Sequence, residues 1–349
     1  MAFDRHTQHG TDHIVILDGT LSSLMPGEET NAGLAYKLIR ARRGRTTTIF
    51  YEPGIQWPSW AKTVEVMAGI GINRQIRRAY QFLCHRWRPG DRIFLLGYSR
   101  GAYAVRSLAG VIDRYGLLRP DIASDRFISY VYSYYQAHRS SRYGDRFAAK
   151  YCQRDVDIQM VGVWDTVKAL GLRAPGLWRI APMATEFHSD QLGHAVRHGF
   201  HALALHETRR AFEPVLWRCP PGWEGHAEQV WFRGSHGDIG GQLTGCHAAR
   251  PLSNIPFVWM MERAEACGLD LPRGWRADYP RDVTAPSVGV NRGWGKLFLN
   301  RSRRVVCSDR SEHIHPSVPD TDPARGPARE EGRRSVLTSV LRARGRVSQ

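Results

Sequence analysis

The chain has 349 residues, a hydrophobic content of 42% and a formal net charge of +16. This length suits one large α/β domain with insertions, and the apolar fraction is enough for a sizeable core. No apolar stretch is long enough to span a membrane, and residues 1–11 are polar. We therefore expect a cytoplasmic protein, which could be exported only by a secretion system that does not require a signal peptide.

The six cysteines are scattered without C-x-x-C spacing, which predicts reduced thiols and neither a disulfide framework nor a zinc site. We expect no metal and no cofactor. The basic charge suits anionic lipid head groups, acidic proteins or nucleic acid, or reflects an arginine-rich composition alone. Nucleic acid is the least favoured partner, because the arginines are dispersed and no aromatic-interleaved basic groove is evident.

The first part of the chain alternates between strand and helix patterns. Three stretches have the continuous apolar or β-branched character of buried strands: residues 13–17, 46–51 and 93–96. Helical spacing of apolar residues marks three others: residues 31–43, the stretch that Asn73 can cap, and the stretch after Gly101. This order predicts an α/β fold with a doubly wound, mostly parallel sheet and helical insertions.

Between about residues 121 and 150, aromatic side chains at helical spacing predict an inserted pair of helices. Their aromatic face is either core or part of a pocket for an apolar substrate. A strand follows at residues 157–164. The loop at residues 171–190, rich in Pro, Met and Trp, comes just after the carboxyl end of that strand, where a lid would belong.

The rest of the chain contains four more predicted elements: a helix at 192–205, strands at 213–217 and 228–232, and an amphipathic helix at 252–267. Beyond about Pro316 large apolar residues become rare. We therefore divide the chain into a catalytic domain at 1–318 and a basic, disordered tail at 319–349. Within the tail, residues 335–344 have the alternative pattern of a short basic amphipathic helix.

The segment Gly97-Tyr98-Ser99-Arg100-Gly101 lies between a predicted strand and a predicted helix. In that setting G-x-S-x-G is the nucleophile elbow of α/β-hydrolases, and the alternative is an ordinary glycine-rich turn. Gly97 and Gly101 leave room for a serine in a strained backbone conformation, and the helix N-terminus supplies backbone N–H groups. Ser99 is therefore the candidate nucleophile.

A serine nucleophile needs a base, and the base needs an acid to orient it. In α/β-hydrolases the acid and then the histidine follow the nucleophile, each beyond the carboxyl end of a strand. Asp165 directly follows the strand at 157–164, and His236 comes just after the strand at 228–232. These two residues complete the candidate triad with Ser99.

The competing side chains are less well placed. Asp157 starts its strand, at the wrong edge of the sheet, and Asp238 is better suited to brace the glycine-rich turn after His236. His206 and Glu207 lie in a helical pattern, which favours a structural role. Three further histidines lack a preceding strand: His247, His313 and His315.

Two backbone donors are needed to stabilise an oxyanion. The first is the N–H of Arg100, which the elbow aims, and the second comes from the loop Asp18-Gly19-Thr20 after the first strand. Gly19 allows close backbone approach. Asp18 is expected to organise this loop through hydrogen bonds from its side chain to the backbone.

Several segments in order resemble successive motifs of a single family: residues 17–20, 97–102, 161–166, 201–207, 230–241 and 315–318. The family is the α/β-hydrolase domain named after the type VI secretion phospholipase effectors. The resemblance runs from about His13 to Val318. It implies a serine esterase of phospholipase A type, with Ser99, Asp165 and His236 at the triad positions. His206 stands where many relatives carry an acidic residue, and Gly237 where a serine is common.

We therefore expect acyl-ester hydrolysis by a metal-free Ser-His-Asp mechanism, with a glycerophospholipid as substrate. Two alternatives stay open: a soluble carboxylesterase for small esters, and a basic interaction protein that does not use its hydrolase fold. The expected partners are a lipid or ester substrate, an anionic membrane surface and a secretion or immunity partner of unknown identity.

Overall fold

A computed structural model gives the fold of most of the chain. It describes residues 10–42, 44, 46–54, 70–137, 142–167, 191–219, 222–291, 300–306 and 308–325. The expected lid at 171–190 and the expected amphipathic segment at 335–344 lie outside the described residues.

Seven strands form one sheet in the order β2-β1-β3-β6-β7-β8-β9, and each of these neighbouring pairs is parallel. The strands are β1 (Asp12–Leu17), β2 (Thr47–Glu52), β3 (Arg92–Tyr98), β6 (Ile158–Trp164), β7 (His198–Ala204), β8 (His226–Phe232) and β9 (Glu312–Ile314). Two short strands, β4 (Leu117–Leu118) and β5 (Cys152–Gln153), form a separate antiparallel pair. The carboxyl ends of the seven parallel strands meet at one edge of the sheet.

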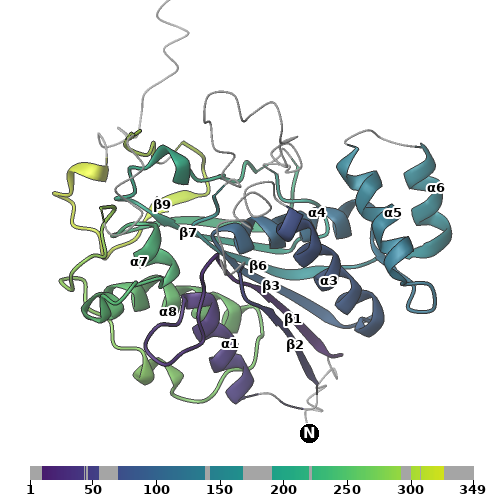
Figure 1. Cartoon of the computed structure of the whole chain (residues 1–349), viewed down its shortest axis with the longest axis horizontal. Coiled ribbons are helices and arrows are strands. Elements are labelled where there is room, and N and C mark those ends of the chain that lie inside the picture. The colour runs from purple at the N-terminus through teal and green to yellow at the C-terminus, as the bar shows by residue number, and fades with distance from the viewer. Residues whose placement is uncertain are drawn as a thin grey trace, which may run out of the picture.

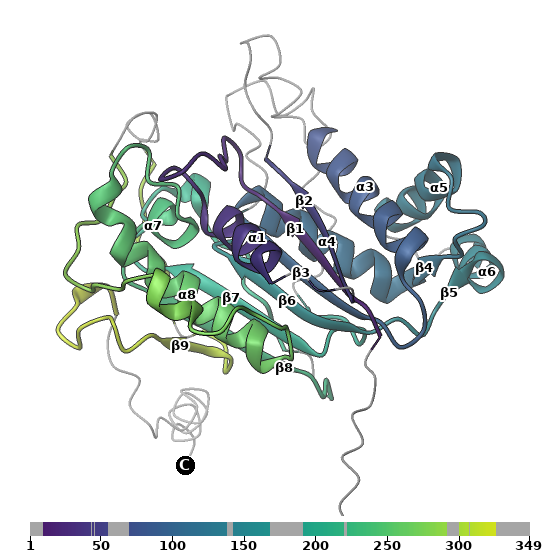
Figure 2. The same cartoon turned by 90° about the horizontal axis from the view of Figure 1, so that it is seen from below.

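Helices cover both faces of this sheet (Figures 1 and 2). One face packs against α1 (Asn31–Ala41), the short α7 (His236–Gly240) and α8 (Arg250–Ala266), and the other against α3 (Ile70–Arg86) and α4 (Arg100–Tyr115). Within β1, Ile14 and Ile16 belong to the hydrophobic core on the side of α1 and α8, whereas Val15 and Leu17 belong to the core on the side of α3 and α4. Burial on both faces explains the continuous apolar runs and confirms the predicted doubly wound α/β fold.

The inserted segment forms two helices, α5 (Asp125–Gln136) and α6 (Arg142–Tyr151), beside α3 and α4 at one side of the molecule (Figure 1). Their aromatic side chains pack on one another: the ring centroids of Phe127, Phe147 and Tyr151 lie 4.9 to 5.8 Å apart. The aromatic pattern therefore serves mainly to join the two helices.

Three local predictions were wrong. The stretch at 192–205 contains strand β7 instead of a helix; its alanines and leucine favour a helix, but pairing with β6 and β8 outweighs that preference. No strand forms at 213–217, where Pro214 makes only an isolated bridge with Val167. Asn73 lies inside α3 and is not its cap; its side-chain oxygen accepts a hydrogen bond from the Tyr132 hydroxyl.

The folded part of the chain continues past the predicted boundary at residue 318. A 3-10 helix at Pro323–Arg325 follows, and the Arg325 guanidinium donates to the carbonyl of Val318 at 2.9 Å. Residues 319–325, which were predicted to belong to the tail, are therefore part of the described fold. No helix in the described ranges combines the length and the apolar character that crossing a bilayer requires.

Candidate active site

Ser99 occupies the turn between β3 and α4, at the carboxyl edge of the sheet. Its backbone has φ 55° and ψ −117°, a region that L-residues rarely adopt. The neighbouring glycines are required by close packing: a Cβ on Gly101 would lie 2.0 Å from the Leu17 carbonyl oxygen, and one on Gly97 would lie 2.7 Å from the Gly101 oxygen. The turn has the geometry of a nucleophile elbow.

His236 is the first residue of α7, just after β8. Its Nε2 lies 2.9 Å from Ser99 Oγ, and its Nδ1 lies 2.6 Å from Asp165 Oδ2. An ionised carboxylate can only accept, so Nδ1 carries the proton toward Asp165 and Nε2 is free to accept from the serine hydroxyl. The structure thus brings together the three side chains that the sequence singled out.

Asp238 holds α7 in place. Its Oδ2 accepts from the backbone N–H of Ser235 at 2.7 Å in a capping box, and its Oδ1 accepts from the N–H of Val288 at 2.8 Å. Asp238 therefore has the local bonding expected of a brace for this turn.

Asp165 directly follows β6 and is fully buried. Besides His236, its carboxylate accepts from the backbone N–H of Ala204 at 3.0 Å and from the Arg304 guanidinium at 2.6 and 3.0 Å. Burial alone would raise the pKa of Asp165, but the Arg304 charge and the hydrogen bond from His236 outweigh it and hold that pKa well below its usual range. Asp165 is therefore ionised beside the imidazole.

The loop after β1 adjoins the serine, since a Cβ on Gly19 would lie 3.4 Å from the Cβ of Ser99. The Gly19 N–H, however, donates to Asp18 Oδ1 at 2.6 Å, so it is not available as the predicted oxyanion donor. Within the described ranges, the N–H groups of Thr20 and Arg100 have no hydrogen-bond partner. These two N–H groups remain the candidate donors.

Asp18 is buried at the end of β1. Its carboxylate also accepts from the hydroxyls of Thr30 at 2.6 Å and Tyr51 at 2.9 Å. Burial raises the pKa of Asp18 to about 6, although these hydrogen bonds act in the opposite direction. Asp18 organises the loop, as its position in the sequence predicted.

Glu207 was assigned to a helix, but it lies beyond the end of β7, at the same edge of the sheet as His236. It is buried, and its Oε2 accepts from the backbone N–H of His236 at 3.2 Å. Burial alone would raise the pKa of Glu207, but hydrogen bonds from Arg209 at 2.6 and 2.8 Å outweigh it and lower that pKa. A correct strand assignment for β7 would have pointed to this residue.

Two other histidines have local structural partners. His206 Nδ1 accepts from the N–H of Gly234 at 3.0 Å, which leaves Nε2 to donate to Asp322 at 3.0 Å. His315 does follow a strand, β9, contrary to the prediction, yet its ring stacks on Phe232 with centroids 4.5 Å apart. Burial lowers the pKa of His315 to about 4. Of the remaining candidates, His313 lies within β9, and Asp157 pairs with Arg197 at the opposite end of β6.

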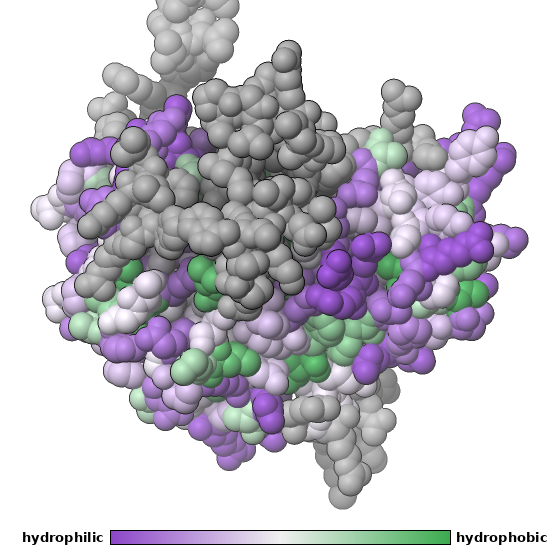
Figure 3. Space-filling model, in the orientation of Figure 1, coloured by the Kyte–Doolittle hydropathy of each residue, from purple (hydrophilic) through white to green (hydrophobic). Residues whose placement is uncertain are grey.

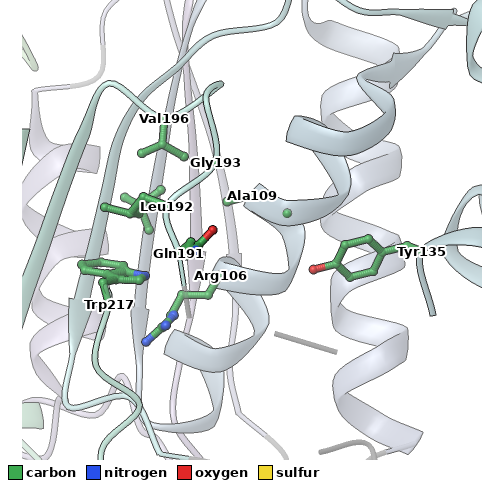
Figure 4. Close-up of a pocket in the computed structure, with 10 residues that line it drawn as sticks. Arg106, Ala109, Tyr135, Gln191, Leu192, Gly193, Val196 and Trp217 are labelled. Carbon is green, nitrogen blue, oxygen red and sulfur yellow. The ribbon is translucent and has the colours of Figure 1, made fainter. Parts of the chain in front are cut away.

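A small cavity of about 30 Å³ lies between α4 and the stretch that precedes β7, lined among others by Arg106, Tyr135 and Trp217 (Figure 4). It has room for about one water molecule and is far too small for an acyl chain. A wider groove of about 610 Å³ is lined by residues 213–218 together with Ser308 and Asp309. Ser99 lines neither of these two spaces.

The parallel sheet, covered on both faces and carrying a serine elbow at its carboxyl edge, defines an α/β-hydrolase-like protein. Residues 12–263 match the family model for the Tle1-like catalytic domain of type VI secretion (T6SS) phospholipase effectors. The chain belongs to this family, which confirms the resemblance found in its motifs.

Individual proteins are similar over part of their length. The Saccharomyces cerevisiae uncharacterized protein YEL023C is 26% identical in an alignment of 242 residues that covers 62% of this chain and 34% of the yeast protein. Among solved structures, an uncharacterized protein from Pseudomonas aeruginosa gives a TM-score of 0.41 at 17% identity, over 79% of this chain and 50% of that one. The Tle1 effector bound to the VgrG spike of the type 6 secretion system gives a TM-score of 0.33 at 18% identity, over 66% of this chain and 51% of that one. The chain thus spans about a third to a half of these proteins.

Proposed function

We propose that the chain is a serine hydrolase that cleaves acyl esters of lipids, with Ser99 as nucleophile, His236 as general base and Asp165 as the carboxylate that orients His236. The observation that carries this proposal is the 2.9 Å contact between His236 Nε2 and Ser99 Oγ, at a serine in a strained elbow. That distance is within the range for proton transfer between a nucleophile and its base.

In this mechanism Ser99 Oγ attacks the ester carbonyl carbon while its proton passes to His236 Nε2. Asp165 stabilises the imidazolium that forms, and the backbone N–H groups of Arg100 and Thr20 stabilise the oxyanion. The imidazolium then returns its proton to the alcohol oxygen as the C–O bond breaks. Water then attacks the acyl-enzyme while His236 takes its proton, and the imidazolium returns that proton to Ser99 Oγ as the bond between Oγ and the acyl carbon breaks and the fatty acid leaves.

Two observations support a lipid as substrate. The family to which the chain belongs is that of phospholipase effectors. In addition, Leu21 and Met25, in the loop that adjoins Ser99, expose 46% and 69% of their surface. On the face shown in Figure 3, the hydrophobic residues that are not grey form only small separate patches. We propose a glycerophospholipid and cleavage of phospholipase A type.

The test compares the wild type with Ser99→Ala on phosphatidylglycerol vesicles and on a water-soluble short-chain ester, together with labelling by a fluorophosphonate probe. We expect the wild type to release fatty acid and to be labelled, and Ser99→Ala to do neither. Ser133→Ala, a change at an exposed serine on α5, is the matched control and should behave as the wild type.

Each alternative has its own outcome. Hydrolysis of the short-chain ester alone would overturn the lipid assignment and support a small-ester carboxylesterase. A folded wild type that is neither labelled nor active on any ester would overturn the serine-hydrolase proposal and support the interaction protein.

A further inference from the structure

We propose that Arg304 is a positioning residue of this site: it orients the Asp165 carboxylate toward His236 and shares its negative charge. The inference rests on the proposed function. It assigns part of the reaction to a segment that lies beyond residue 263, where the match to the family model ends.

The contact between Arg304 and Asp165 is bidentate. Nη1 donates to Oδ1 at 2.6 Å and Nη2 donates to Oδ2 at 3.0 Å, so the planar guanidinium faces both oxygens of the carboxylate. The side chain of Arg304 is 5% exposed and that of Asp165 is 0% exposed. A buried fork of this kind fixes the rotation of the carboxylate much more firmly than a single hydrogen bond would.

The guanidinium is itself anchored by the backbone. Nη1 also donates to the carbonyl of Ala204 at 2.8 Å and Nη2 to the carbonyl of Phe212 at 2.5 Å. Ala204 is the last residue of β7, and its N–H donates to Asp165 Oδ1. Arg304 therefore joins Asp165 to the end of β7 and to the loop that follows it.

Residues 300–306, which we call the strap, lie along the loop after β7. Arg301 forms an antiparallel bridge with Arg209, and the N–H of Ser302 donates to the carbonyl of Thr208 at 2.8 Å. The N–H of Arg210 donates to the carbonyl of Asn300 at 3.1 Å. Backbone pairing thus sets the position from which Arg304 reaches Asp165.

Asp165 Oδ2 serves His236 Nδ1 and Arg304 Nη2 at the same time. Because the guanidinium carries a fixed positive charge, it offsets part of the carboxylate charge that would otherwise stabilise the imidazolium. Removing that charge makes protonation of the imidazole more favourable. In a variant without this charge, Nε2 of His236 would then be protonated, and unable to act as the base, up to a higher pH than in the wild type.

Other titratable or charged groups surround the pair. Glu207 and Arg209 form their own ion pair on the loop after β7. His201 of β7 is uncharged at neutral pH, because burial lowers its pKa to about 3. Two further groups face the site from β3 and α4: Tyr98, whose ring centroid is 5.0 Å from that of His236, and Arg106, whose charge acts on His201. None of these groups hydrogen-bonds to the Asp165 carboxylate among the described residues, whereas Arg304 does so twice.

The experiment measures kcat and KM between pH 5 and 9, on the short-chain ester and on vesicles, for Arg304→Met, Arg304→Lys and the control Arg303→Met. Arg303 lies in the same strap but is exposed. For Arg304→Met we expect kcat to fall about tenfold or more, with the acidic limb of kcat/KM displaced upward by about one pH unit. Arg304→Lys keeps the charge without the fork, so kcat should fall while the limb stays in place. Arg303→Met should match the wild type.

The outcomes separate this inference from the proposed function. An active wild type whose acidic limb is unchanged in Arg304→Met would overturn the inference, because a merely structural loss lowers the rate without moving the limb. If Arg304→Met does not fold, the test rests on Arg304→Lys. A kcat of Arg304→Lys equal to that of the wild type would then overturn the inference. A wild type without activity or probe labelling would overturn the proposed function, and this inference with it.

Discussion

Gly101 lies against the carbonyl oxygen of Leu17, so close that a Cβ at position 101 would be 2.0 Å from that oxygen. This contact joins the first turn of α4 to the end of β1. A second close approach occurs nearby, where a Cβ on Gly54 would lie 1.7 Å from the carbonyl oxygen of Gly19. The ends of β1, β2 and β3 are thus packed at backbone distance, and this packing sets the loop with Asp18 beside Ser99.

The first prediction is that Gly101→Ala destabilises the fold by roughly 2–3 kcal/mol, because the backbone of β1 or α4 must shift to admit the methyl group. Urea unfolding gives the change in the free energy of unfolding. Gly44→Ala is the control, since a Cβ there meets no atom within 4 Å, and it should change stability by less than about 0.5 kcal/mol. Equal stability of the two variants would contradict the steric explanation.

The second prediction concerns the exposed apolar side chains in the loop after β1, whose Gly19 adjoins Ser99. Replacing Leu21 and Met25 together by serine removes the apolar surface that we assign to lipid contact. We expect hydrolysis of vesicles to fall about tenfold or more while hydrolysis of the short-chain ester changes less than about twofold. The double variant Tyr130→Ser/Tyr143→Ser, at exposed positions on α5 and α6, is the control. An equal loss on both substrates would remove this argument for a lipid substrate.

The sequence was sufficient to single out three side chains that the structure places in contact with one another. Ser99 could be found because its glycines and the flanking strand and helix are adjacent in the chain. Asp165 could be found because it directly follows β6, and His236 because it comes shortly after the apolar end of β8. The sheet type followed from the alternation of strand and helix patterns along the chain, and from the nearly continuous apolar runs of central strands such as β1 and β3.

What the sequence could not give depends on contacts between distant residues. Arg304 reaches Asp165 across 139 positions, from a stretch without regular structure, so no local pattern marks it. Strand β7 was assigned as a helix because its residues lack the β-branched character of the other strands, and pairing on both sides decides its conformation. That error also hid Glu207. The sequence predicted that the Asp18 side chain bonds to the backbone of this loop, but not that the N–H it engages is the one of Gly19 that was expected to bind the oxyanion.

The third prediction follows from the pKa of Asp18, which burial raises from 3.8 to about 6. The folded chain then binds more protons than the unfolded chain between about pH 4 and 6, so this residue's contribution to stability is present below that window and is lost as pH rises through it. Asp18→Asn should remove this slope and raise the free energy of unfolding at pH 7 by at most about 3 kcal/mol. Urea unfolding at several pH values tests this, with Asp157→Asn, at an exposed position, as the control. An unchanged pH slope in Asp18→Asn would contradict it.

The fourth prediction concerns His201, a fully buried residue of β7 whose Nε2 accepts from the N–H of Thr166 at 3.1 Å. Burial, assisted by the charge of Arg106, lowers the pKa of His201 from 6.5 to about 3. The unfolded chain therefore binds more protons between about pH 3 and 6.5, and the stability that neutral His201 provides is lost as pH falls through that window.

The variant His201→Gln keeps an acceptor for the Thr166 N–H and cannot take up a proton near these pH values. We expect the wild type to lose about 2 kcal/mol from this residue between pH 7 and pH 5, and His201→Gln to lose correspondingly less over the same interval. The comparison uses the difference between the two pH values, because repacking lowers the stability of the variant at every pH. Between about pH 4 and 6 the contributions of Asp18 and His201 have opposite slopes, so the two single variants should diverge from the wild type in opposite directions as the pH is lowered. If the free energies of unfolding of the wild type and His201→Gln have parallel pH profiles, the folded protein does not lower the pKa of His201, and this prediction is wrong.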